Sequence, residues 1–131
     1  MTTQPKNNVV GWFEVPVTDM KRAMNFYETV FDIKLERNQM GPLDMAWFPW
    51  SEGGMGSSGS LVYHAEMYRP SADGVVVYFT AHSGDLANEL SRVEAAGGKA
   101  LQPKTLINED IGYMALIVDS EGNRVALNSR K

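Results

Sequence analysis

Residues 9–31, VVGWFEVPVTDMKRAMNFYETVF, place a strand pattern directly before a helix pattern. Side chains alternate along residues 9–17, so that one face is apolar or small throughout and the other carries Trp12 and Glu14. Asp19 is a helix N-cap type, and apolar residues follow it at helical spacing: Met20, Ala23, Met24, Tyr27, Val30 and Phe31. The pattern predicts that the uniform face packs under the helix and that the mixed face borders water or a ligand.

A second copy of this pattern follows later in the chain. Residues 75–82 form a β-branched strand, Asp85 caps another helix, and Gly97 with Gly98 ends it. Tyr78 precedes Asp85 by the interval that separates Trp12 from Asp19. The other predicted strands are residues 33–37, 44–50, 61–64, 100–107, 113–118 and 124–128. We therefore expect an α+β fold of two βαβββ modules, about 9–66 and 74–128, forming a curved eight-stranded mixed sheet with outer helices and an inner cleft.

Composition narrows the classes of function. The chain has 131 residues, no cysteine, 12 basic and 16 acidic residues and a formal net charge of −4. Scattered basic residues argue against nucleic-acid binding, and no apolar run approaches the ~20 residues of a membrane span. We expect a disordered lead over residues 1–8 and a single domain over residues 9–131. We also expect a cytoplasmic location, because the absence of cysteine fits a reducing compartment.

Three motifs carry a resemblance to a known superfamily. They are VPVTDMKRAMNFY at residues 15–27, VEAAGG at 93–98 and VDSEGN at 118–123, with Ser120 where the family's turn has proline. Together they resemble the glyoxalase / bleomycin resistance / extradiol dioxygenase superfamily over residues 9–128. The resemblance implies the paired βαβββ fold and a homodimer. It also implies, for the enzymes, a divalent metal held in the cleft by His and Glu side chains.

The positions that match the family's metal ligands carry other residues here. They are Trp12 in the first strand, Tyr78 in the fifth and Ala126 in the last, with the remaining ligand expected within residues 60–64, where His64 is the one candidate. Trp and Ala cannot coordinate a metal, and neutral Tyr is a poor divalent ligand. We expect no cofactor and no usual metal site, while a relocated metal involving His64 or His82 stays open.

The same positions predict a ligand-binding wall. Trp12, Trp47 and Tyr78 can stack an aromatic or hydrophobic molecule, although ordinary core or dimer packing explains such residues equally well. Thr80 and Tyr113 complete the expected ligand contacts. Glu14, on the face of Trp12, is a candidate general base or a simple ion-pair partner. The Gly/Ser-rich residues 53–60 form a flap over the cleft or a plain hairpin loop.

Three functions remain open on this evidence. The first is a metal-independent protein that binds a small molecule, as in resistance by sequestration. The second is an enzyme of lyase, isomerase or hydrolase type that uses Glu14 or a relocated metal. The third is a subunit whose aromatic residues line an interface with a partner.

Overall fold

The computed structural model describes residues 6–131, so part of the predicted lead, residues 1–5, lies outside the described residues. The first module contains β1 (Phe13–Pro16), α1 (Met20–Phe31), β2 (Glu36–Met40), β3 (Leu43–Trp47) and β4 (Gly59–Tyr63). The second contains β5 (Tyr78–Thr80), α2 (Leu86–Leu90), β6 (Lys99–Asn108), β7 (Gly112–Val118) and β8 (Arg124–Ser129). The predicted repeat of βαβββ modules and the α+β fold class are confirmed.

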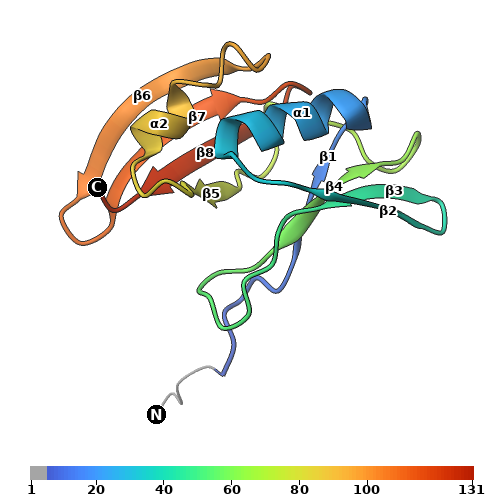
Figure 1. Cartoon of the computed structure of the whole chain (residues 1–131), viewed down its shortest axis with the longest axis horizontal. Coiled ribbons are helices and arrows are strands. Elements are labelled where there is room, and N and C mark those ends of the chain that lie inside the picture. The colour runs from blue at the N-terminus through green and yellow to red at the C-terminus, as the bar shows by residue number, and fades with distance from the viewer. Residues whose placement is uncertain (1–5) are drawn as a thin grey trace.

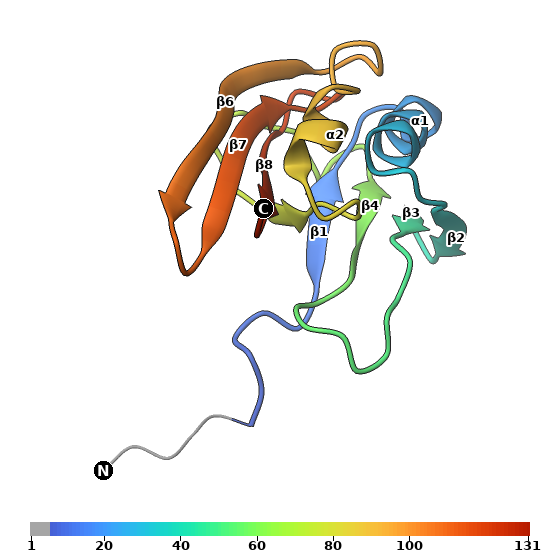
Figure 2. The same cartoon turned by 60° about the vertical axis from the view of Figure 1, so that its left-hand side comes forward.

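Hydrogen bonding divides the eight strands into two mixed sheets of four. Their strand orders are β1-β4-β3-β2 and β5-β8-β7-β6, so β1 and β5 are equivalent edge strands. Each edge strand pairs in parallel with the last strand of its own module, and the remaining pairs are antiparallel. Both helices lie on the same side of the two sheets (Figures 1 and 2). The predicted outer helices and curved arrangement are therefore present. The expected eight-stranded sheet is divided into two, because β1 and β5 are not hydrogen-bonded to each other.

Both helices begin where the capping residues predict. The Asp19 carboxylate accepts a hydrogen bond from the Arg22 backbone N–H at 3.1 Å, and Asp85 accepts one from the Ala87 N–H at 3.0 Å. Each cap satisfies a donor that the first helical turn would otherwise leave unpaired. In both modules, therefore, the chain passes from the edge strand into a helix that begins after a capping aspartate.

Several strand boundaries differ from the prediction. The first and fifth strands are shorter than residues 9–17 and 75–82. β1 begins at Phe13, opposite Gly59, the first residue of β4, and β5 pairs with β8 over Tyr78–Thr80 alone. The strand predicted at residues 33–37 starts at Glu36 instead, since the tight turn at Gly41, with φ of 61°, aligns Met40 with Leu43. Alternation of apolar residues identifies a strand but does not give the length of its ladder.

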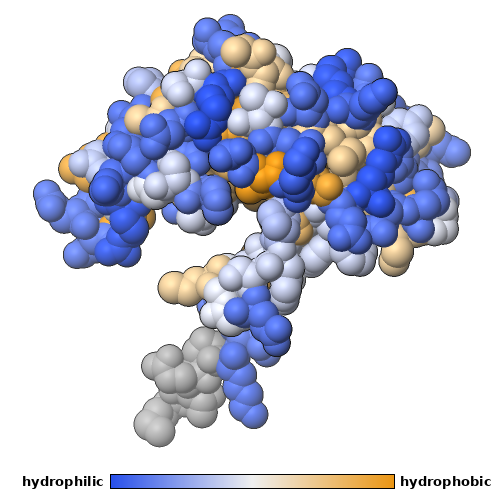
Figure 3. Space-filling view, in the orientation of Figure 1, coloured by the Kyte–Doolittle hydropathy of each residue, from blue (hydrophilic) through white to orange (hydrophobic). Residues whose placement is uncertain are grey.

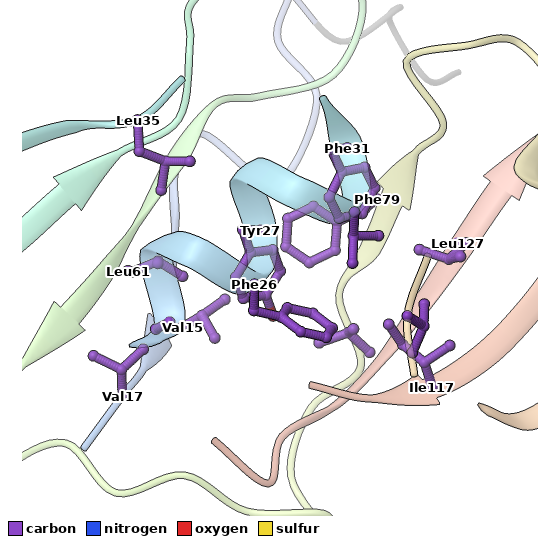
Figure 4. Close-up of a cluster of buried hydrophobic side chains, with 14 of the residues drawn as sticks. Val15, Val17, Phe26, Tyr27, Phe31, Leu35, Leu61, Phe79, Ile117 and Leu127 are labelled. Atoms are coloured by element: carbon purple, nitrogen blue, oxygen red, sulfur yellow. The ribbon is translucent and has the colours of Figure 1, made fainter. Parts of the chain in front are cut away.

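The hydrophobic core is shared by the two modules. Phe26, Tyr27 and Val30 of α1 are fully buried. Figure 4 shows the α1 side chains between Leu61 and Val15 of the first module and Ile117 and Leu127 of the second. The Phe13 and Phe79 rings, from the two edge strands, meet with centroids 5.5 Å apart. Core packing therefore joins β1 and β5 where hydrogen bonding does not.

A polar cluster at the turn of residues 119–123 also joins the modules. The Glu121 carboxylate accepts hydrogen bonds from the Thr18 and Asp19 backbone N–H groups, both at 2.9 Å, and from Arg22 Nε at 2.7 Å. Tyr27 donates its hydroxyl to Asp119 at 2.6 Å. Burial opposes ionisation of Glu121, but these hydrogen bonds outweigh it and lower its pKa to about 2. The VDSEGN motif therefore connects the second module to the start of α1.

Candidate functional site

A cavity of about 1180 Å³ lies beside the junction of β1 and β5. Three segments border it: an arm (residues 6–12) through Asn8, Val9, Val10 and Trp12, the β3–β4 loop (residues 48–58), and residues 75–82. The arm and the β3–β4 loop leave the body of the molecule in the same direction (Figures 1 and 2). The space-filling view shows a hollow between these projections and the second module (Figure 3). The volume is slightly above the ~300–1,000 Å³ of typical pockets for small organic ligands, so the cavity has room for a molecule of that size.

The inner surface of this cavity is aromatic. Phe13, Phe31, Phe48 and Phe79 all line it and all belong to the core or pack against it. Phe48 lies 5.6 Å from Phe13 and 5.4 Å from Phe79, measured between ring centroids. Because these rings support one another, the surface is held in place before any ligand arrives. Such a surface favours a flat, apolar ligand.

Three of the expected ligand contacts meet at this cavity. Trp12, Tyr78 and Thr80 all line it, since β1 and β5 bring equivalent residues of the two modules together. Trp12 is 41% exposed and Tyr78 is 52% exposed, so both rings are accessible to a ligand. Trp50 and His82 also line the cavity.

Trp47 and Tyr113 are placed elsewhere. Trp47 packs edge-on against Trp12, with ring centroids 6.0 Å apart, and lines neither this cavity nor the smaller cleft described next. Tyr113 lies on the core side of β7, with Lys104 Nζ 4.5 Å from its ring centroid. Trp47 can therefore hold the Trp12 ring in position, whereas Tyr113 does not line the cavity. Strand alternation alone did not indicate which face of β7 meets the core.

Glu14 borders a separate, smaller cleft of about 240 Å³. The Tyr68 hydroxyl donates a hydrogen bond to Glu14 Oε1 at 2.6 Å. That hydrogen bond is the main cause that raises the pKa of Tyr68 above its ordinary value. Arg69 and Arg124 line the same cleft. Neither arginine belongs to a recognisable sequence motif, although Arg124 shares the strand phase of Ala126.

The residues at the family's metal-ligand positions do not fit a metal. Tyr78 pairs with Ala126 across β5 and β8, and extending the β1–β4 register by one residue sets Trp12 beside Ser58. The fourth position is therefore Ser58 rather than a residue within 60–64. Indole, phenol, methyl and hydroxyl groups do not form a neutral-pH site for a divalent ion. Within residues 6–131, no three His, Asp or Glu side chains converge as metal ligands.

The two histidines have different environments. His64 Nδ1 accepts hydrogen bonds from the Glu66 N–H at 3.2 Å and the Met67 N–H at 3.0 Å, and so closes a turn. His82 lies at the rim of the large cavity. The two side chains therefore occupy separate sites.

Comparisons with known proteins agree on the fold. A model of the Glyoxalase/Bleomycin resistance protein/Dioxygenase superfamily matches residues 9–127. TnmS3, an antibiotic binding protein from a Streptomyces species, has a TM-score of 0.70 at 21% identity, over 98% of this chain and 100% of that chain. A glyoxalase/bleomycin resistance protein from Albidiferax ferrireducens has a TM-score of 0.70 at 16% identity, over 94% of this chain and 100% of that chain.

Glyoxalase I from Zea mays is also similar, with a TM-score of 0.65 and 19% identity over 91% of this chain. The match covers 45% of the maize chain, so the present chain spans less than half of that protein's length. No curated protein sequence shows significant similarity. No helix within residues 6–131 combines the length and the apolar character needed to cross a bilayer.

Proposed function

The chain belongs to the Glyoxalase/Bleomycin resistance protein/Dioxygenase superfamily, and we propose that it is a binding protein that holds an aromatic or hydrophobic small molecule without a metal. The observation that carries this proposal is the aromatic inner surface of the large cavity, bordered by Trp12 and Tyr78. At two of the four positions where a metal enzyme of the family would need ligands, this chain has rings, Trp12 and Tyr78, that can stack on a ligand. TnmS3, which has the same fold and matches this chain over the whole length of its own chain, is an antibiotic binding protein. This similarity supports binding as the class of function.

Glu14 supports a second candidate, an enzyme of lyase or isomerase type. The carboxylate lies on β1 two residues beyond Trp12 and holds a short hydrogen bond with Tyr68. This arrangement pairs a proton acceptor with a proton donor, as general acid–base catalysis requires. Glu14 lines the smaller cleft and not the aromatic cavity, which favours the binding function over this alternative.

We further propose that the binding protein is a homodimer in which a second copy covers the arm and the β3–β4 loop. Val9 and Met55 are fully exposed, and Trp50 is 68% exposed, on segments that leave the body together. Exposed apolar side chains gathered on projecting segments are typical of surfaces that another protein covers. A second copy seated there would also close the open side of the cavity. The cytoplasmic location remains a prediction from the sequence.

Tryptophan fluorescence tests the binding proposal, because two of the three tryptophans, Trp12 and Trp50, line the cavity. The probes are 2-naphthol, a small neutral aromatic, and bleomycin. We expect saturable quenching, and Tyr78→Ala should weaken the naphthol affinity roughly tenfold, the effect of losing one stacked ring worth ~1.5 kcal/mol.

Tyr63→Ala is the matched control, since Tyr63 is an exposed aromatic residue that lines neither cavity. Equal losses in the two variants, or quenching that rises linearly without saturation, would rule out specific binding at Tyr78.

A further inference from the structure

The smaller cleft contains two arginines and no paired anion. Arg69 belongs to the connector between the modules, and Arg124 is the first residue of β8. Among the described residues, neither guanidinium has a carboxylate within 4.0 Å, whereas Arg22, Arg37 and Arg92 each have one. With the Glu14 carboxylate that also lines it, the cleft has two positive charges and one negative charge, in a chain whose net charge is −4.

Arg124 has an unmet hydrogen-bonding requirement. Its Nε is buried and has no acceptor within residues 6–131, and its Nη2 reaches the Gly74 carbonyl oxygen at 3.5 Å, the outer limit of a hydrogen bond. A buried donor without an acceptor is unfavourable, and a charged one more so. Nε has almost no accessible surface, so the partly exposed Arg124 side chain would have to shift for an acceptor in the cleft to reach it and remove this penalty.

Glu14 does not supply that acceptor. Its carboxylate lines the cleft, but its hydrogen bond is with Tyr68, and no guanidinium is in ion-pair range of it in the described chain.

The wall of the cleft is also held in place. Asn123 accepts a hydrogen bond from the Ser71 N–H at 3.1 Å and donates one to the Pro16 carbonyl oxygen at 2.7 Å. The arginines consequently face a preformed space rather than a loop that must fold around a ligand.

We propose that this cleft is an anion-binding site in which Arg124 and Arg69 hold an oxyanion, the carboxylate or phosphate group of a small molecule. Guanidinium groups suit such groups because their planar N–H donors match the spacing of paired oxygens. The volume of about 240 Å³ accommodates a small anionic group. The cleft shares the lining residues Phe13, Val75 and Val77 with the large cavity, so the two lie next to each other. The site itself does not depend on occupancy of the large cavity.

Nuclear magnetic resonance of the arginine Nε–H groups tests the proposal in the full chain. Inorganic phosphate and acetate are titrated separately at constant ionic strength, maintained with sodium chloride. We expect a saturable shift of the Arg124 Nε–H signal, with an affinity at least roughly tenfold weaker in Arg69→Ala, since a charge-assisted contact is lost. The tighter of the two anions identifies phosphate or carboxylate as the preferred group.

Arg37→Lys is the control, because Arg37 is an ion-paired arginine on β2 that lines neither cavity. Arg124→Lys keeps the charge but removes the Nε–H that carries the signal, so binding in this variant is followed at the Arg69 Nε–H, whose saturable shift should be lost. Arg69→Ala changes an exposed position and therefore keeps the test valid if Arg124→Lys unfolds. Equal shifts at Arg37 and Arg124, shifts that do not saturate, or an unchanged affinity in Arg69→Ala would overturn the proposal. None of these outcomes changes the expected naphthol binding, so the anion-site proposal and the aromatic-cavity proposal can be refuted independently.

Discussion

Replacing Glu121 by glutamine tests how the two modules are held together. The Glu121 side chain is fully enclosed, and its carboxylate accepts hydrogen bonds from the Thr18 and Asp19 backbone and from Arg22. Its pKa is lowered from an ordinary 4.5 to about 2. At about 1.4 kcal/mol for each pH unit of that interval, the ionised group stabilises the fold by ~3 kcal/mol. Because Arg22 is half exposed, solvent screening reduces this to ~2 kcal/mol.

The sign of the pH dependence follows from the lowered pKa. A carboxylate whose pKa is lower in the folded state contributes its full stabilisation above about pH 4.5 and loses it as the pH falls through about 2. Glutamine has no such titration. The free energy of unfolding of Glu121→Gln should therefore be ~2 kcal/mol lower than that of the natural protein at pH 7, and the difference should vanish near pH 2.

Urea denaturation followed by circular dichroism, at pH 7, 4.5, 3 and 2, measures this difference directly. Glu94→Gln serves as the control, because Glu94 is exposed and its change should leave the free energy of unfolding within ~0.5 kcal/mol. A gap between Glu121→Gln and the natural protein that stays constant across these pH values would refute the electrostatic explanation.

Three further predictions concern other parts of the structure. Ser60→Ala should leave the free energy of unfolding unchanged or raise it by up to ~1 kcal/mol in urea denaturation, because the buried Ser60 hydroxyl has no partner in the described chain. Gly98→Ala should lower it by ~1–3 kcal/mol, since an added Cβ would lie 2.5 Å from both the Phe26 ring and the Val118 carbonyl oxygen. Met55→Glu should weaken dimerisation at least roughly tenfold in sedimentation equilibrium, because it places a charge on the proposed interface.

Each of these variants has a matched control. Ser58→Ala removes a hydroxyl that donates to the Phe48 carbonyl oxygen at 3.2 Å, and should destabilise by ~1 kcal/mol where Ser60→Ala does not. Gly11→Ala adds a Cβ with no atom within 4 Å and should be nearly neutral. Met67→Glu changes an exposed methionine away from the arm and the β3–β4 loop. A dimer weakened equally by Met67→Glu and Met55→Glu would contradict the proposed interface.

The repeated strand-to-helix pattern predicted the fold because its signals are local. Asp19 and Asp85 cap helices through hydrogen bonds to residues two or three positions away. The repeat then implied that Trp12 and Tyr78 occupy equivalent places on β1 and β5. Both rings line the same cavity for that reason.

Predictions that depended on strand phase were less accurate. Tyr113 was expected to contact a ligand, yet it shares the phase of Ala115 and Ile117, both fully buried, and lies on the core side of β7. Alternation shows which residues share a face, but the packing of neighbouring strands decides which face meets the core.

The sequence by itself determined the two modules, the capped helices and the superfamily, because each depends on residue identity or on spacing over a few positions. Tertiary structure alone decided that Phe31 and Phe48 form the inner surface of the cavity, and that Arg69 and Arg124 share a cleft. Those residues are far apart along the chain, and their meeting depends on how β1 and β5 pack through Phe13 and Phe79. Packing of that kind arises from the whole core, and no local pattern of residues specifies it.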